Sequence, residues 1–106
     1  MKLPLPTPAE RALRQLGQDL SRARRRRRWS QASFAERCGM SVATLKRLER
    51  GDPGVGMEQL ARALYLLGEI ARLEGLLDTS EDAIGLALMD EALPRRVRSK
   101  RSSGAL

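Results

Sequence analysis

Arginine is the residue type in this sequence best suited to directed contacts with a ligand. Five arginines, Arg24 to Arg28, follow one another, and Lys46, Arg47 and Arg50 form a second basic group. An arginine side chain can bond the O6 and N7 atoms of guanine together, and basic side chains bind phosphates. The chemistry that these residues indicate is therefore hydrogen bonding to a nucleic acid.

The charge of the 106-residue chain is divided unevenly along its length. Residues 1–51 hold 13 Lys/Arg and 4 Asp/Glu, residues 52–93 hold 2 and 9, and residues 94–106 hold 5 and none. The basic half indicates a polyanionic partner, whereas the acidic segment indicates a different role.

The composition argues against catalysis, metal binding and membrane insertion. The sequence has no His and a single Cys, Cys38, so it lacks the commonest general base and offers no zinc site or disulfide framework. It contains no nucleophile–base pair and no phosphate-binding loop, and we therefore expect no enzyme activity, no metal and no cofactor. No apolar run approaches the ~18 residues of a membrane helix, and no signal-peptide core follows Met1. We expect a reduced, soluble protein of the bacterial cytoplasm, associated with the nucleoid when bound.

Leucine and alanine recur at spacings of three and four residues, which predicts an all-α protein. Ser30 and Ser41 are placed to cap the second and third helices, and Gly39 to end the second in a left-handed conformation. Thr7 is placed to cap the first helix, with Pro8 at its first position. We expect five short helices, over about residues 9–26, 31–38, 42–50, 57–67 and 69–77.

These expectations divide the chain into three parts. Alternate prolines make residues 1–9 an extended leader, residues 10–77 form the helical domain, and residues 78–106 form a partly disordered tail. The conformation of the tail stays open. Ile84, Leu86 and Leu88 alternate as in a strand, residues 79–82 resemble a capping box that opens a short helix, and Gly85 weakens both interpretations. Met89 and the tail leucines are expected either to contact a partner or to pack on their own domain or dimer mate.

Residues 31–50 have the pattern of two short helices that cross steeply. Ala35 supplies a small residue where the two helices touch, and Gly39 tolerates the positive φ of the tight turn. An apolar set fixes the crossing, which leaves the other positions of the second helix of the pair free to face a major groove. That set is Phe34, Cys38, Met40, Leu45 and Leu48.

The sequence resembles the Cro/C1-type (XRE) helix-turn-helix regulators over roughly residues 10–77. The residues that carry the resemblance are Leu16, Leu20, Ala23-Arg24, Trp29-Ser30-Gln31, Ala35, Gly39, Leu45 and Leu48-Glu49-Arg50-Gly51. The resemblance implies a five-helix, lambda-repressor-like domain and an ion pair between Arg24 and Glu49. It also implies that base edges are read by Ser41, Val42, Ala43 and Arg47.

The remaining polar residues are expected to contact the DNA backbone. Gln31 lies at a helix N-terminus that favours a phosphate, and the resemblance implies a contact there with the backbone or an adjacent base edge. Some of the four arginines Arg25, Arg26, Arg27 and Arg28 should reach phosphates. They cannot all do so, because consecutive helical residues cannot all face one partner. The alternative is that the run is a solvated group of charges. Thr44, Lys46 and Arg50 flank the base-reading positions as further backbone contacts. Trp29 is expected to be a lid on the core more than a stacking platform.

Two departures from the family pattern stand out. Val42 and Ala43 occupy positions at which relatives carry polar base readers, so shape readout is expected to compensate. Gly56 replaces the usual Ser cap of the next helix.

A narrower resemblance concerns the short HipB-type antitoxins that are paired with HipA-like kinase toxins. It rests on Gly51-Asp-Pro-Gly-Val55, Ile84-Gly-Leu-Ala-Leu88 and Leu93-Pro-Arg-Arg-Val-Arg98. It implies an antitoxin that also represses its own operon. The leading interpretation of the whole sequence is a repressor that acts as a homodimer on double-stranded operator DNA. Two alternatives stay open: a protein-interaction antitoxin that works mainly through residues 52–106, and a basic protein that binds nucleic acid without sequence preference.

Overall fold

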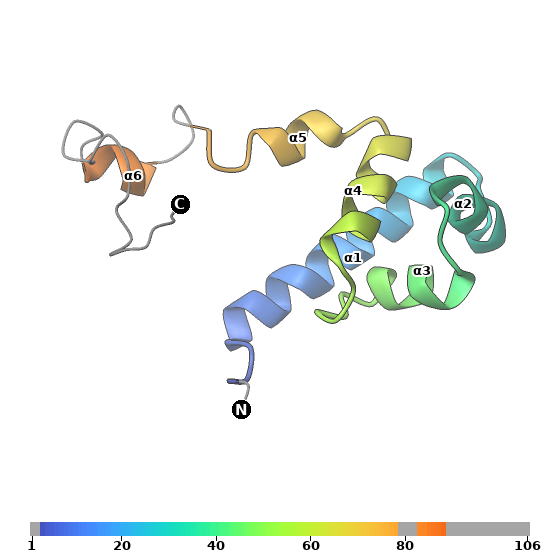
Figure 1. Ribbon diagram of the computed structural model, residues 1–106, viewed down its shortest axis with the longest axis horizontal. Helices are drawn as coiled ribbons and strands as arrows, with labels where there is room; N and C mark the ends of the chain where they lie inside the picture. Colours follow the sequence, from blue (N-terminus) through green and yellow to red (C-terminus); the bar gives the residue numbers. More distant parts are fainter. Residues whose placement is uncertain (1–2, 79–82, 89–106) are drawn as a thin grey trace, which may run out of the picture. The chain divides into compact units, whose positions relative to one another are not determined.

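The computed structural model describes residues 3–78 and 83–88, and in this part of the chain every regular element is a helix, as predicted (Figure 1). Two compact units divide at residue 73, into residues 1–73 and 74–106. The helices are α1 (Thr7–Arg26), α2 (Gln31–Cys38), α3 (Val42–Glu49), α4 (Met57–Leu66), α5 (Ile70–Glu74) and α6 (Ala83–Ala87).

The caps of α2 and α3 follow the sequence closely. Ser30 Oγ accepts a hydrogen bond of 3.0 Å from the Ser33 N–H, and Ser41 Oγ accepts one of 3.0 Å from the Thr44 N–H. Each bond satisfies an N–H that has no partner inside its helix. Gly39 ends α2 with a φ of 74°, so the predicted left-handed stop is confirmed.

The predicted start of α1 is wrong by two residues. Thr7 is the first helical residue and not the cap; Pro6 occupies the cap position, without any side-chain hydrogen bond. The Pro6 carbonyl accepts the Glu10 N–H at 3.0 Å, which closes the first turn. Pro8 fits that turn because its missing N–H would have no partner there.

The end of α1 explains why the five arginines do not continue one helix. Arg28 has a φ of 59°, and in the described residues it is the only non-glycine with a positive φ. Its N–H bonds the Arg25 carbonyl at 2.9 Å, and the Trp29 N–H bonds the Arg24 carbonyl at 3.3 Å. This pair of bonds is the motif in which a left-handed residue terminates a helix, and Arg28 stands where glycine usually does.

The later helices differ more from expectation. α5 begins at Ile70 and ends at Glu74, three residues before the predicted end. Residues 83–87 form the helix α6, so the strand alternative for that segment is wrong. The expected capping box at residues 79–82, Met89 and the rest of the tail that was expected to be partly disordered lie outside the described residues.

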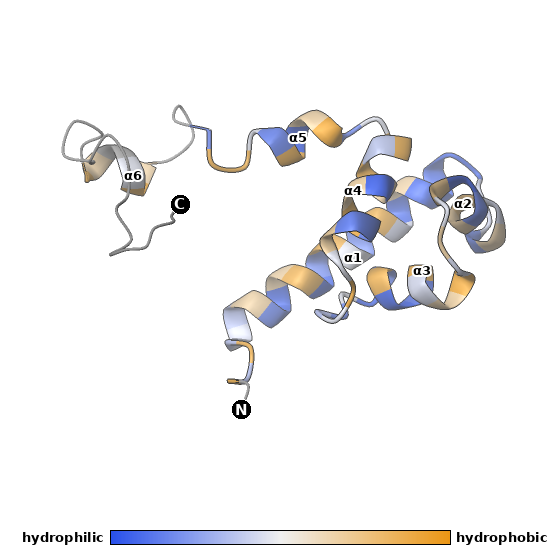
Figure 2. Ribbon diagram, in the orientation of Figure 1, coloured by the Kyte–Doolittle hydropathy of each residue, from blue (hydrophilic) through white to orange (hydrophobic). Residues whose placement is uncertain are grey.

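The core of the first unit joins α1 to α4 around Phe34. Figure 2 shows hydrophobic and hydrophilic residues along each of these helices, as expected of amphipathic segments. Cys38 is 1% exposed and belongs to this core, and its burial raises the pKa of the thiol against the opposing charge of Arg62. The buried hydrophobic residues are Leu20, Phe34, Ala35, Cys38, Leu45, Leu48, Ala63 and Leu67, and the partly buried Met40 packs against them.

Candidate nucleic-acid interface

The axes of α1 and α3 approach closely where two glycines face backbone. An ideal Cβ on Gly17 would lie 2.5 Å from the Glu49 carbonyl oxygen, and one on Gly51 would lie 2.5 Å from the Leu13 carbonyl oxygen. Gly51 also has a φ of 77°, which lets the chain leave α3 at a sharp angle. This contact fixes the position of α3 relative to α1.

A buried hydrogen-bond network completes the attachment of α3. Arg24 donates to both carboxylate oxygens of Glu49, from Nε at 2.7 Å and from Nη2 at 3.2 Å, and from Nη1 to the Trp29 carbonyl at 2.8 Å. Gln31 Nε2 also donates to Glu49 Oε1, at 3.0 Å. The Arg24 and Glu49 side chains are only 9% and 7% exposed. The ion pair that the resemblance implies is therefore present, and it joins α1, α3 and the start of α2.

The outward side of α3 presents the positions that the sequence assigned to DNA. Leu45 and Leu48 are buried, whereas Ala43 and Lys46 are exposed, together with Arg50 just beyond the helix. Helical periodicity places positions 43, 46, 47 and 50 in one stripe. Among the described residues no carboxylate forms an ion pair with Lys46 or Arg50. This stripe is a small, cationic and accessible surface.

Arg47 lies in that stripe, but its side chain is held by the loop that follows α3. Its Nε donates to Asp52 Oδ2 at 2.8 Å, and the two side chains are 43% and 34% exposed. The hydrogen bond from Arg47, followed by one from the Gly54 N–H, lowers the pKa of Asp52, and the same contact with Asp52 raises the pKa of Arg47. The pair therefore stays ionised at neutral pH, and its contribution is lost only as the pH falls through the lowered pKa of Asp52.

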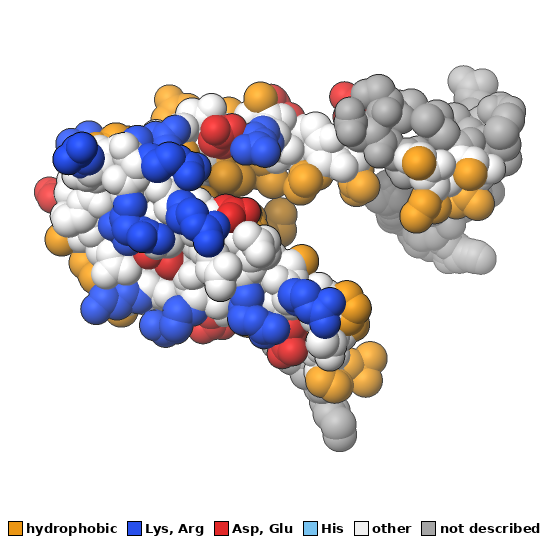
Figure 3. Space-filling view, turned by 180° about the vertical axis from the view of Figure 1, so that it is seen from behind, with side chains coloured by type: hydrophobic (Ala, Val, Ile, Leu, Met, Phe, Trp, Pro, Cys, Tyr) orange, Lys and Arg blue, Asp and Glu red, His pale blue; other side chains and the backbone are white. Residues whose placement is uncertain are grey.

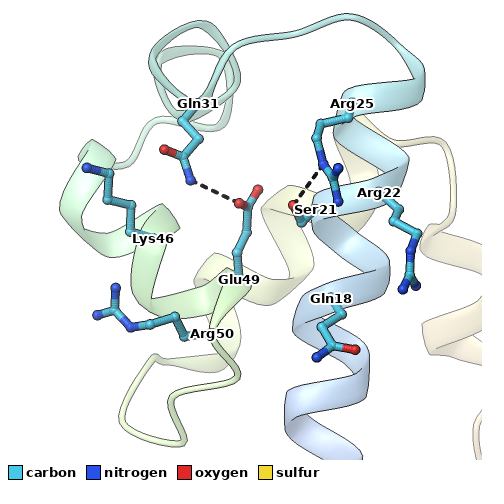
Figure 4. A pocket seen from close by; sticks show the side chains of 8 residues that line it. All are labelled: Gln18, Ser21, Arg22, Arg25, Gln31, Lys46, Glu49 and Arg50. Atoms are coloured by element: carbon cyan, nitrogen blue, oxygen red, sulfur yellow. Dashed lines mark hydrogen bonds between the residues drawn. The ribbon is translucent and has the colours of Figure 1, made fainter.

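A hollow of about 390 Å³ lies between α1, the start of α2 and the end of α3 (Figure 4). Gln31 points from α2 toward Glu49 across this hollow. Arg22 and Arg25 line it from α1, and Lys46 and Arg50 line it from the side of α3. Because the carboxylate of Glu49 is already bound to Arg24, the hollow is a positively charged site next to the α3 stripe. The sequence assigned three of these cations to the DNA backbone and missed Arg22, which gives no signal except its spacing of three from Arg25.

The arginine run has several different surroundings. Arg25 Nε donates to Ser21 Oγ at 3.3 Å, whereas Arg27 donates to the Ala23 carbonyl at 2.8 Å and the Leu67 carbonyl at 2.9 Å. Arg27 thus ties the end of α1 to the end of α4, a use that the sequence did not reveal. Arg26 and Arg28 are exposed. Figure 3 shows Lys and Arg side chains spread over one face of the first unit, with Asp and Glu side chains between them.

Trp29 packs inward, in keeping with the expected lid. Its ring stacks on Phe34 with a centroid distance of 5.5 Å, and the guanidinium of Arg37 covers it at 5.2 Å. The ring therefore has an aromatic and a cationic neighbour within the protein.

Metal-binding clusters and membrane-spanning helices are both absent from the described residues. No group of three or more His, Cys, Asp or Glu in them could hold a metal ion. Nor does any helix of the described part have the length and apolar character needed to cross a membrane.

Comparison with known families gives a match to a helix-turn-helix domain over residues 15–78. The matched segment covers more than half of the chain, from the middle of α1 to beyond α5. No curated protein and no solved structure is similar enough to count as a match.

Proposed function

Because the chain belongs to the helix-turn-helix domain family, we propose that it is a sequence-specific transcriptional repressor that binds double-stranded operator DNA through α3. A helix-turn-helix places its second helix in the major groove. Here that helix is α3, and we assign base contacts to Ser41, Val42, Ala43 and Arg47. Arg47 is the principal reader, because Val42 and Ala43 can offer only apolar contacts, for instance to thymine methyl groups.

The observation that carries this proposal is the accessible cationic stripe of α3 beside the cationic hollow. A base-reading helix needs small or polar residues toward the groove and cations beside it for the phosphates. The stripe has Ala43 facing outward, and Lys46, Arg50 and Arg25 surround the hollow. Gln31 and Thr44, with Arg26 and Arg28, complete the proposed backbone contacts. Among the arginines expected to contact the DNA backbone, Arg27 is the weakest candidate, since its guanidinium already donates to the Leu67 carbonyl.

The test is a mobility-shift titration on DNA from upstream of the protein's own gene, at ~0.15 M salt and with excess nonspecific competitor. Wild-type protein is compared with Arg47→Ala. We expect a wild-type complex that survives the competitor and that Arg47→Ala weakens by about 5- to 100-fold, the discrimination that one good bidentate contact provides.

The control is Arg11→Ala, an exposed cation on α1 that lines neither the stripe nor the hollow. It removes the same charge and should retain most of the specific complex. If the competitor erases binding equally for all three proteins, the operator proposal fails and binding without sequence preference replaces it.

We further propose that the repressor acts as a homodimer. Two copies place their recognition helices about 34 Å apart, which suits a nearly palindromic operator. Sedimentation of the complex on one operator duplex checks this: two chains per duplex support a dimer, and one chain contradicts it.

The finer role that we propose is that of an autoregulating antitoxin of a HipBA-like module, acting in the bacterial cytoplasm. Its support is the resemblance in residues 51–55, 84–88 and 93–98, together with the acidic character of residues 52–93, which hold 2 basic and 9 acidic residues. An acidic segment disfavours DNA and suits a protein partner. Neutralisation of the toxin through residues 52–106 is then a second activity beside repression.

Co-expression tests this role. A kinase-like product of the adjacent gene should co-purify with the full chain and should not co-purify with the chain ended after residue 77. Retention of the kinase by the shortened chain would restrict the toxin contact to residues 52–77 and exclude the tail from it. A full chain that captures no kinase would contradict the antitoxin role.

A further inference from the structure

Asp52 is held in place from two directions by its own loop and by α3. Its Oδ1 accepts the Gly54 N–H at 2.8 Å, and its own N–H donates to the Arg47 carbonyl at 3.0 Å. Its second oxygen, Oδ2, receives Arg47 Nε at 2.8 Å. A carboxylate that bonds the backbone two residues ahead has little freedom to rotate. The acceptor for Arg47 is therefore fixed before any ligand arrives.

The loop also leaves room for the guanidinium beside this carboxylate. An ideal Cβ on Gly54 would lie 2.8 Å from Arg47 Nη2 and 3.2 Å from Asp52 Oδ1. Any larger residue at position 54 would push the end of the arginine away from its present place. Gly54 thus leaves the space that the Arg47 guanidinium needs beside Asp52. Because Gly54 is uncharged, replacing it changes this space and no charge.

The pair engages only one edge of the guanidinium. Arg47 Nε is bound to Asp52, and among the described residues neither Nη1 nor Nη2 makes a hydrogen bond. These two groups are the donors that can meet O6 and N7 of guanine together. A free arginine side chain loses much rotational freedom on binding, and a side chain that is already held loses less.

We propose that Asp52 is a positioning residue for Arg47, which aims Nη1 and Nη2 at a guanine and at the same time repels DNA that lacks this guanine. The inference rests on the proposed function, in which α3 reads operator DNA. The repulsion arises because the carboxylate lies next to the DNA-facing stripe. At the correct site the guanine contact outweighs the repulsion, and elsewhere the repulsion remains uncompensated.

Two substitutions separate the orientation of the Arg47 side chain from the negative charge of Asp52. Asp52→Asn removes the negative charge and weakens the hold on Arg47, whereas Gly54→Ala displaces the guanidinium and leaves every charge in place. The probes are a duplex of the upstream DNA, duplexes in which single G·C pairs are replaced by A·T, and a random duplex. Fluorescence anisotropy at one salt concentration measures each dissociation constant, and thermal melting shows that each variant is folded.

The expected pattern is specific to a positioning role. The G·C pair read by Arg47 is the one whose replacement no longer matters in Arg47→Ala. At that pair Asp52→Asn and Gly54→Ala should each lower the discrimination by about two- to tenfold, the effect of releasing one ordered side chain. Asp52→Asn should also bind the random duplex more tightly, whereas Gly54→Ala should not. In an Arg47→Ala background, Asp52→Asn should leave the discrimination unchanged.

Three results with Asp52→Asn would overturn the inference. Asp52→Asn could discriminate as well as the wild type, it could weaken binding to every duplex by the same factor, or it could lower discrimination equally without Arg47. A wild type that prefers no duplex would overturn the proposed function and the inference together. A wild-type preference that both substitutions leave intact would overturn the inference alone.

Discussion

Two arginine–carboxylate pairs lie at the end of α3, and they differ mainly in their access to water. Arg24 and Glu49 are 9% and 7% exposed and share two hydrogen bonds, whereas Arg47 and Asp52 are 43% and 34% exposed and share one. The first pair has further partners in Trp29 and Gln31. The chemical groups are nearly the same, and their surroundings are not.

The difference indicates how one residue type serves two purposes in a small domain. A buried pair cannot be separated without leaving a charge away from water, so it becomes part of the architecture. An exposed pair competes with water and adds little to stability, so its free donors remain available for a ligand. For these two pairs, burial separates the arginine that holds helices together from the arginine that faces the proposed DNA. Arg27 is different, because it is exposed and still ties α1 to the end of α4.

The largest expected effect tests the buried pair. Glu49→Ala leaves Arg24 buried without its partner and removes the acceptor of Gln31. The free energy of unfolding should fall by about 3–5 kcal/mol, the cost of breaking a buried ion pair from one side. Urea unfolding followed by circular dichroism measures this change.

The matched control is Asp52→Ala, which breaks the exposed pair and should leave the unfolding midpoint nearly unchanged. A double change, Arg24→Met with Glu49→Leu, should recover most of the loss, because no charge then remains buried. Equal losses for Glu49→Ala and Asp52→Ala would show that burial does not distinguish the two pairs.

A smaller effect is expected at the crossing of α1 and α3 that supports the buried pair. In Gly17→Ala the new methyl group would lie 2.5 Å from the Glu49 carbonyl oxygen. Overpacking against backbone costs about 1–3 kcal/mol, which exceeds the gain of about 0.5–1 kcal/mol from the better helix propensity of alanine. We therefore expect a net loss of stability in the same urea assay.

Gly54→Ala is the control for this prediction. Its nearest atoms belong to the movable side chains of Arg47 and Asp52 and not to backbone. It should leave the unfolding midpoint nearly unchanged. A Gly17→Ala variant more stable than the wild type would show that the helices can move apart at no cost.

The sequence predicted most of what depends on local order. The bounds of α2, the caps Ser30 and Ser41 and the turn at Gly39 follow from neighbouring residues, and the structure confirms them. The Arg24–Glu49 contact came from a family resemblance and not from spacing. The roles assigned to the base-reading and backbone residues stay predictions.

What the sequence could not predict depends on distant neighbours. The letters of the arginine run are identical, yet Arg27 bonds the carbonyl of Leu67, which is 40 residues away. No local pattern marks that contact. The role of Asp52 was also not apparent from the sequence. Its contact with Arg47 depends on how Gly51 turns the chain back toward the last turn of α3.

The smallest expected effect concerns Arg28, an exposed arginine whose backbone conformation is strained. Its φ of 59° is a conformation that glycine adopts without penalty and arginine does not. Arg28→Gly should therefore raise the free energy of unfolding by about 0.5–1 kcal/mol. If Arg28 binds a phosphate as proposed, the same change should weaken DNA binding and reduce the slope of log affinity against log salt by about 1.

Arg28→Ala separates the two effects, because it removes the guanidinium and retains the strained backbone. It should reduce the salt slope as much as Arg28→Gly does, without the gain in stability. Equal stability of the two variants would contradict the strain. An unchanged salt slope in both variants would show that Arg28 does not contact a phosphate. Arg28 would then be an exposed arginine that faces solvent and not DNA.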